Sequence, residues 1–275
     1  MSFTTADVVK LRKISGAGMM DCKNALQEAG GNIERALEII REKGKLVASK
    51  RADREATEGV VLSKVSENNK FGAIIVLNCE TDFVAKNENF IAFADSILNV
   101  ALEQKPETLN SLKNLDLDGR PIENQVIEQT GIIGEKLDLS YYGKIDAEMV
   151  ISYIHPGNKL AALVGFNKAN VDTQVAKDVA MQVAAMAPIA ISKDLISREI
   201  IEKELEIATE KFRQEGKPEA MLEKIAQGSL IKWYKEVALL EQAFIKDAKI
   251  SVKDYLAQHD KELTVTGFER YTLND

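Results

Sequence analysis

A repeated order of predicted elements constrains the fold of this chain most strongly. An apolar stretch, a polar turn, a second apolar stretch and an amphipathic segment follow one another twice. Branched apolar residues on both sides of a short turn predict a β-hairpin, and apolar residues three or four apart predict a helix. The repeat therefore predicts an α+β fold with two similar subdomains packed together. The first copy is expected at residues 59–65, 71–77 and 87–101, and the second at 149–154, 160–166 and 175–186.

The N-terminal part of the chain predicts three short helices before the first copy. Thr4 or Thr5 can cap the first helix, and Asp21 and Asn32 can cap the second and third. The third helix is expected to end at Gly44, because glycine commonly follows the last turn of a helix. A charged linker is expected to follow it. The expected boundaries are 1–57 for this helical domain with its linker and 58–148 for the N-terminal core subdomain, in which a strand at 137–142 follows a loop.

Two amphipathic helices are predicted in residues 191–241. Apolar residues step by three and four along this region, with an interruption at residues 214–218. Each arm has only about two to three heptads, which is short for a free-standing coiled coil. An antiparallel hairpin inserted into the core is therefore expected. Residues 149–190 and 242–275 would form the C-terminal core subdomain, with strands near 243–246 and 263–271 and a helix over 252–259.

Residues 76–87 (VLNCETDFVAKN) join the first predicted hairpin to its helix. Asn78, Thr81 and Asp82 are residue types that cap helices and support turns. Phe83 has two interpretations at this corner. It can pack inward, which spacing alone favours because most aromatic side chains lie in cores, or it can project from a rigid corner as an anchor for a partner.

Two segments carry a resemblance to a known family. Residues 78–87 (NCETDFVAKN) and 11–26 (LRKISGAGMMDCKNAL) resemble signatures of the bacterial elongation factor Ts family, the nucleotide exchange factors of elongation factor Tu. The resemblance implies that the N-terminal helices form a ubiquitin-associated-like domain and that the hairpin is a coiled-coil, dimerisation-type insertion. It leaves open whether the hairpin joins a homodimer, a heterotetramer with Tu, or another partner.

The resemblance also implies a role for the corner at residues 81–84. In the family, the residues matching Asp82 and Phe83, with Thr81 and Val84 beside them, intrude near the magnesium and phosphate site of Tu. This implication reverses the expectation that Phe83 packs inward. The expected function is promotion of GDP release from Tu, without bond-making or bond-breaking chemistry in this chain. A protein-interaction adaptor without exchange activity is the alternative.

Two further groups of residues match family contacts. Arg12, Met19 and Met20 match residues that touch the nucleotide-binding domain of Tu, whereas the residue types alone allow both methionines to fill gaps in a core. A second group matches residues that contact the distal domain of Tu, although a histidine before Pro-Gly can also be an ordinary exposed turn residue. The members of this second group are Ile133, Gly134 and His155.

Composition and motifs narrow the function classes. A net charge of −7 counts against dedicated nucleic-acid binding. The basic residues within 45–54 could contact RNA or an acidic partner surface, but a solvated face of the linker is the favoured interpretation. Cys22 and Cys79 share no metal-ligand spacing, and no phosphate-binding glycine motif is present, so neither a metal nor a cofactor is expected. No apolar run approaches the roughly 20 residues of a membrane helix, and the N-terminus lacks a signal-peptide layout. We therefore expect a cytoplasmic protein.

Overall fold

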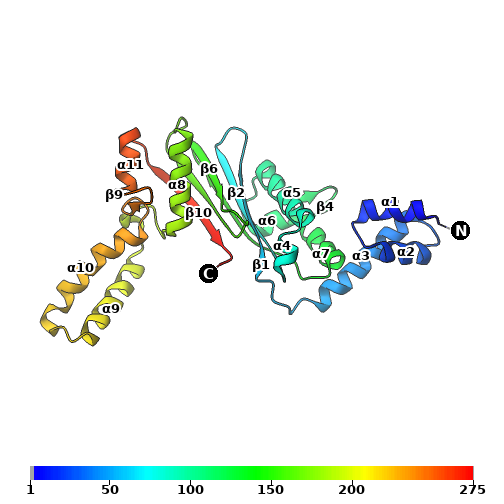
Figure 1. Cartoon of the computed structure of the whole chain (residues 1–275), viewed down its shortest axis with the longest axis horizontal. Helices are drawn as coiled ribbons and strands as arrows, with labels where there is room; N and C mark the ends of the chain where they lie inside the picture. Colours follow the sequence, from blue (N-terminus) through cyan, green and yellow to red (C-terminus); the bar gives the residue numbers. More distant parts are fainter. Residues whose placement is uncertain (1–2, 275) are drawn as a thin grey trace.

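A computed structural model describes residues 3–274 as an elongated molecule. A helical N-terminal domain, a core of sheets and helices, and a helical hairpin follow one another along the long axis (Figure 1). The predicted α+β class is confirmed.

The helices are α1 (Thr5–Ser15), α2 (Met19–Glu28), α3 (Ile33–Lys50), α4 (Asp82–Ala85), α5 (Glu88–Gln104), α6 (Leu109–Asn114), α7 (Ile122–Ile133), α8 (Thr173–Met186), α9 (Arg198–Gln214), α10 (Glu219–Val237) and α11 (Val252–His259), with a 3₁₀ turn at Lys193–Leu195. The strands are β1 (Glu58–Val65), β2 (Phe71–Cys79), β3 (Asp116–Leu117), β4 (Arg120–Pro121), β5 (Asp138–Asp146), β6 (Met149–Ile154), β7 (Leu160–Phe166), β8 (Ala243–Phe244), β9 (Asp247–Ser251) and β10 (Val265–Thr272).

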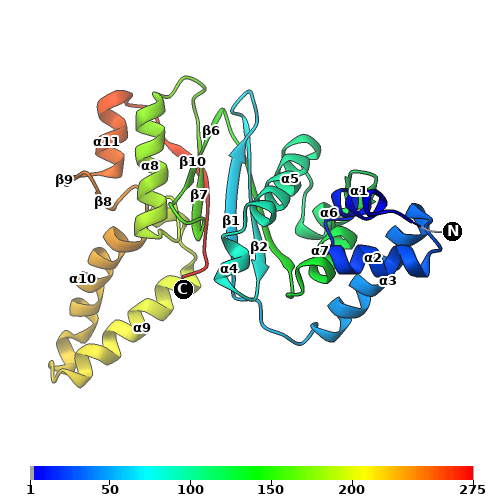
Figure 2. The ribbon, with the colours of Figure 1, turned by 45° about the vertical axis from the view of Figure 1, so that its right-hand side comes forward.

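The core contains two antiparallel three-stranded sheets that pack face to face. Their strand orders are β1-β2-β5 and β10-β7-β6. Helix α5, with α6 and α7, covers the outer face of the first sheet, and α8 and α11 cover the outer face of the second (Figure 2). Strand β2 is buried along its whole length, because it is the central strand and is covered on both faces. The buried residues between the sheets are Val61, Ile74, Val76, Ile145, Val150, Ala161 and Leu163.

The two hairpins of the core bond each other reciprocally. The backbone N–H of Val150 donates to the carbonyl of Asn69, at 2.6 Å, and the N–H of Val61 donates to the carbonyl of Asn158, at 2.7 Å. Asn69 and Asn158 occupy matching positions in the two turns, and both have left-handed backbone conformations, with φ of 54° and 57°. Asparagine tolerates this conformation better than most residues. Each hairpin turn is therefore fixed to the first strand of the other hairpin.

The N-terminal domain encloses its own small core, which includes Leu11, Cys22 and Leu26. Two expectations about its helices were wrong. Helix α2 begins at Met19, so Asp21 lies in its first turn, where a carboxylate is still favourable near the helix N-terminus. Helix α3 does not end at Gly44 but continues to Lys50. The linker between this domain and the core is correspondingly shorter.

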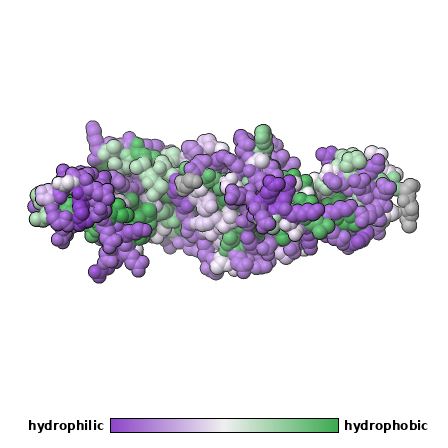
Figure 3. Space-filling view, turned by 90° about the horizontal axis from the view of Figure 1, so that it is seen from below, coloured by the Kyte–Doolittle hydropathy of each residue, from purple (hydrophilic) through white to green (hydrophobic). Residues whose placement is uncertain are grey.

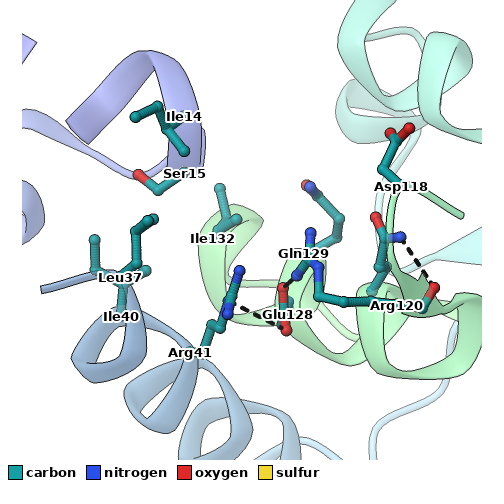
Figure 4. Close-up of a pocket in the computed structure, with 11 residues that line it drawn as sticks. Ile14, Ser15, Leu37, Ile40, Arg41, Asp118, Arg120, Glu128, Gln129 and Ile132 are labelled. Carbon is teal, nitrogen blue, oxygen red and sulfur yellow. Dashed lines mark hydrogen bonds and ion pairs between the residues drawn. The ribbon is translucent and has the colours of Figure 1, made fainter. Parts of the chain in front are cut away.

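Gly44 lies inside α3 because another helix packs against it. Helix α7, which reaches Ile133 in the loop expected before residues 137–142, crosses α3 at Gly131. A Cβ added to Gly131 would lie only 2.1 Å from the Cα of Gly44. Beside this crossing, Arg41 of α3 and Arg120 both pair with Glu128 of α7 (Figure 4). The crossing attaches the N-terminal domain to the core.

The helical hairpin leaves and rejoins the core at neighbouring residues. The N–H of Ile189 donates to the carbonyl of Val237, and the N–H of Leu239 donates to the carbonyl of Ala190, both at 2.9 Å. Helices α9 and α10 extend from this point, away from the sheets (Figure 1). Within residues 3–274, no helix is both long enough and apolar enough to cross a membrane.

Candidate functional site

Phe83 is the most exposed of the large apolar side chains in the described part of the chain, with 83% of its surface accessible. It lies on α4, a single helical turn between β2 and α5. The inward packing that spacing favoured is therefore wrong. Burying a phenylalanine side chain contributes about 1.5–3 kcal/mol, so its exposure leaves this free energy available for binding a partner. Aromatic side chains of this kind often act as anchors in protein interfaces.

Thr81 fixes the start of α4 through all its polar groups. Its backbone N–H donates to Glu135 Oε2, at 3.0 Å, and its hydroxyl donates to Glu135 Oε1, at 2.7 Å. The same hydroxyl oxygen accepts the N–H of Val84, at 3.4 Å, as the N-cap. The carbonyl of Thr81 accepts the N–H of Ala85 and the thiol of Cys79. Burial raises the pKa of that thiol to about 12, so it remains a protonated donor at neutral pH.

A second carboxylate, that of Glu80, points from the same corner to the loop after α7. Glu80 Oε1 accepts the N–H of Lys136, at 2.6 Å, and the guanidinium of Arg51, at 2.7 Å. The bond from the Lys136 amide, followed by the one from Arg51, lowers the pKa of Glu80 from its ordinary value. Glu80 thus binds the amide after Glu135, and Glu135 binds the amide after Glu80. We call these two reciprocal contacts the carboxylate bridge.

Asp82 places a negative charge beside Phe83. Its carboxylate pairs with Lys86 one turn later, at 2.6 Å. The hydrogen bond from Lys86 lowers the pKa of Asp82, so the carboxylate is ionised at neutral pH. The corner therefore presents an apolar ring next to an anionic group.

Ile133 and Gly134 lie close to this corner, although about fifty residues separate them from it in sequence. Ile133 is the last residue of α7, and Gly134 is its C-cap with a left-handed φ of 80°. The next residue, Glu135, makes the bonds to Thr81 described above. Sequence analysis missed Glu135 and Lys136. Their only local signal is that they follow the glycine at which α7 ends.

His155 lies in the exposed turn between β6 and β7, where its Nδ1 is 2.9 Å from the hydroxyl of Tyr153. Lys159 in the same turn pairs with Glu58 at 2.8 Å. Glu58 begins β1 and lies opposite Cys79, two residues before Thr81. The turn with His155 is therefore at the same end of the sandwich as α4.

A hollow of about 380 Å³ connects the corner with the N-terminal domain. Val84 and Phe93 line one side, Ile133 lines the end of α7, and Gly16 lines the side of the N-terminal domain. Gly16 is the C-cap of α1, and its N–H donates to the carbonyl of Arg12. The hollow thus separates the N-terminal domain, which carries Arg12 and the two methionines, from Val84 and Ile133, which belong to the other two groups of candidate residues.

Arg12, Met19 and Met20 lie on the surface of the N-terminal domain. Met19 is 40% exposed and Met20 is 64% exposed, so neither fills a gap in the core of this domain. Arg12 is on α1 and the two methionines are on α2, whereas Phe83 is on α4 in the core. The structure therefore places residues 81–84, 133–134 and 155 at one end of the sandwich and leaves the N-terminal group on a separate domain.

Metal-ligating residue types do not cluster in the part of the chain that the structure describes. Among residues 3–274, no group of three or more histidine, cysteine, aspartate or glutamate side chains is arranged to hold a metal ion. The face of the molecule shown in Figure 3 is mostly hydrophilic, with apolar residues in small separate areas. What the candidate site can do is make contacts through an exposed aromatic ring, an adjacent carboxylate and two nearby loops.

Comparisons with known proteins give a consistent result. A sequence model of the family described as Elongation factor TS matches residues 80–275. The protein named Elongation factor Ts from Azobacteroides pseudotrichonymphae is 52% identical over 274 residues, covering 100% of this chain and 99% of the relative. Its namesake from Porphyromonas gingivalis is also 52% identical, over 275 residues, with coverage of 100% and 99%. The one from Bacteroides fragilis is 41% identical, covering 99% of each chain.

Proposed function

The chain belongs to the elongation factor Ts family, and we propose that it binds elongation factor Tu with GDP and promotes release of the nucleotide. The family supports the general function, a nucleotide exchange factor for elongation factor Tu. Our proposal for the mechanism is that Phe83 and Asp82 enter the partner near its magnesium and phosphate site and disturb it. The proposed place of action is the cytoplasm, where translation takes place.

The exposure of Phe83 is the observation that carries this mechanism. The ring is 83% exposed, but the helix that holds it is fixed by hydrogen bonds on both sides of Thr81. Because the backbone that carries the ring is already ordered, binding has to restrict only the side-chain rotamer, so more of the burial energy of the ring remains for altering the partner. A mobile loop with the same ring would lose much of that energy in becoming ordered.

Exchange by this mechanism requires only binding energy. If the protein weakens GDP binding to Tu, GDP must weaken binding of the protein by the same factor. A thousandfold faster release requires a dissociation barrier lower by roughly 4 kcal/mol. One buried phenylalanine contributes about 1.5–3 kcal/mol, which falls short of that value.

We therefore propose that all three groups of residues contribute to lowering the barrier to GDP release. Phe83 and Asp82 disturb the nucleotide site, with Thr81 and Val84 holding them in place. Two other groups hold the partner while this happens. Arg12, Met19 and Met20 contact its nucleotide-binding domain, and Ile133, Gly134 and His155 contact its distal domain.

Stopped-flow release of a fluorescent GDP analogue from elongation factor Tu, at fixed magnesium, tests the proposal. We expect wild-type protein to accelerate release strongly. Phe83→Ala should reduce the maximum release rate by roughly 10- to 150-fold, the equivalent of about 1.5–3 kcal/mol, while much of the binding remains. Ile231→Ala is the control, because Ile231 is also exposed, at 61%, but lies on the helical hairpin.

The alternative function, an adaptor without exchange activity, has a distinct outcome in the same experiment. An adaptor would bind elongation factor Tu without changing the rate of GDP release. Full acceleration by Phe83→Ala would instead retain the exchange function and remove Phe83 from its mechanism.

A further inference from the structure

We propose that Glu135 is a positioning residue for exchange. Its carboxylate holds Thr81 and, through it, the helical turn that carries Phe83. The inference rests on the proposed function and adds to it a residue outside the proposed contact groups. Glu135 is not proposed to touch the partner, since both of its carboxylate oxygens are occupied by groups of Thr81.

Helix α4 needs this support because of its length. It has only four residues, Asp82–Ala85, and one helical turn fixes many dihedral angles for very few hydrogen bonds. Its N-cap bond, from the N–H of Val84 to the hydroxyl of Thr81, is long at 3.4 Å. The shorter bonds are those from Thr81 to Glu135, at 3.0 and 2.7 Å, and hydrogen bonds to a charged acceptor are stronger than neutral ones. Without Glu135, the turn loses its strongest external contacts.

The position of Glu135 in the chain also links the turn that carries Phe83 to a second group of proposed contact residues. It directly follows Ile133 and Gly134, which are proposed to hold the distal domain of the partner. Glu80 completes the carboxylate bridge by accepting the N–H of Lys136, at 2.6 Å. The two contact groups are therefore joined by three charge-assisted hydrogen bonds, two accepted by Glu135 and one accepted by Glu80. Contact at residues 133–134 fixes the place where Phe83 enters, and the two groups act as one rigid unit.

Three variants test the role in the GDP release assay. In Glu135→Ala, we expect the maximum release rate to fall about tenfold, because loss of bonds to a charged group is worth at least about 1.4 kcal/mol. The protein concentration for half-maximal rate should change less than twofold, since the proposed contact residues remain. Glu135→Gln keeps one acceptor oxygen and should fall between wild type and Glu135→Ala. Glu123→Ala, an exposed glutamate at the other end of α7, should behave as wild type.

A double-mutant cycle distinguishes positioning from general destabilisation. If Glu135 acts through Phe83, Glu135→Ala should slow release less than twofold further in a Phe83→Ala background. Equal slowing in both backgrounds would overturn the inference, and so would an unchanged release rate in Glu135→Ala alone. If Glu135→Ala no longer unfolds cooperatively, the same double-mutant cycle is measured with Glu135→Gln, which keeps the size of the side chain.

Amide hydrogen exchange of the free protein gives a readout without elongation factor Tu. The amides of Val84, Ala85 and Lys86, which donate hydrogen bonds within this turn, should exchange at least fivefold faster in Glu135→Ala than in wild type, while α5 keeps its protection. Unchanged protection of α4 would overturn the inference. Failure of the proposed function is distinguishable, because wild-type protein would then fail to accelerate GDP release whatever the hydrogen exchange of the variants shows.

Discussion

Replacement of Gly131 by alanine tests how the N-terminal domain is attached to the core. An added Cβ would lie 2.1 Å from the Cα of Gly44, whereas non-bonded carbons rest at about 3.5–4.0 Å. The α3–α7 crossing must therefore open by roughly 1.5 Å. Since Gly44 meets Gly131 through its backbone, no flexible side chain can move aside. Overpacking of this kind typically costs about 1–3 kcal/mol.

Hydrogen exchange measured by mass spectrometry can locate this cost. In Gly131→Ala, α3 and α7 should open more easily by about 1–3 kcal/mol, a 5- to 150-fold loss of protection, while α8 remains unchanged. Gly228→Ala is the matched control. A Cβ at Gly228 would meet nothing within 4 Å, so the same substitution there should stabilise α10 by about 0.5–1 kcal/mol.

The reasoning is refuted if Gly131→Ala leaves the protection of α3 and α7 at the wild-type level. It is also refuted if the glycine at position 228 proves equally sensitive, because the effect would then come from the loss of glycine and not from the helix crossing. A second consequence can be measured in the GDP release assay. Displacement of the N-terminal domain should raise the concentration of protein needed for half-maximal release, since Arg12 and the two methionines would lose their place relative to Phe83.

Two further predictions concern stability. Ile97 is completely buried between α5 and the first sheet, so Ile97→Ala should lower the free energy of unfolding by about 2–5 kcal/mol in denaturant titrations; a loss below 1 kcal/mol would contradict the packing described. The pKa of Glu80 is lowered because the Lys136 amide and Arg51 bind its charged form. The stabilisation that Glu80 gives to the folded state is therefore complete above its ordinary pKa of 4.5 and is lost as the pH falls through the lower pKa of the folded state. Protection of α4 should therefore weaken as the pH falls below this ordinary value, and Glu80→Gln should remove this part of the pH dependence.

Much of the core could be predicted from local sequence patterns. The hairpins and the helices α5, α8, α9 and α10 all have the periodicity that their positions in the fold require. Local patterns did not predict helix α7 or the C-terminal end of α3, and the reason is the same in both cases. Gly44 and Gly131 disfavour helix locally, but they permit two helices to touch, and that contact is between residues far apart in sequence.

The candidate site was predictable only in part. Phe83 and its neighbours stand in a recognisable segment, but the direction of the ring followed from resemblance and not from spacing. Glu135 could not be found from sequence, because its partner Thr81 lies 54 residues away and a single glutamate after a helix has no distinctive pattern. Long-range hydrogen bonds of this kind become visible only when the sheet has brought the two segments together.

The order of the strands also has a consequence for synthesis of the chain on the ribosome. The first sheet is complete once β5, which ends at Asp146, has emerged. The helical hairpin of α9 and α10 is translated between β7 and β10. The second sheet cannot be completed until β10 has emerged, because β7 pairs with β10. Until then, the edge of β7 is unpaired, and an unpaired strand edge can associate with other nascent chains. The interval between emergence of β7 and of β10 is thus a period in which this protein is vulnerable to aggregation.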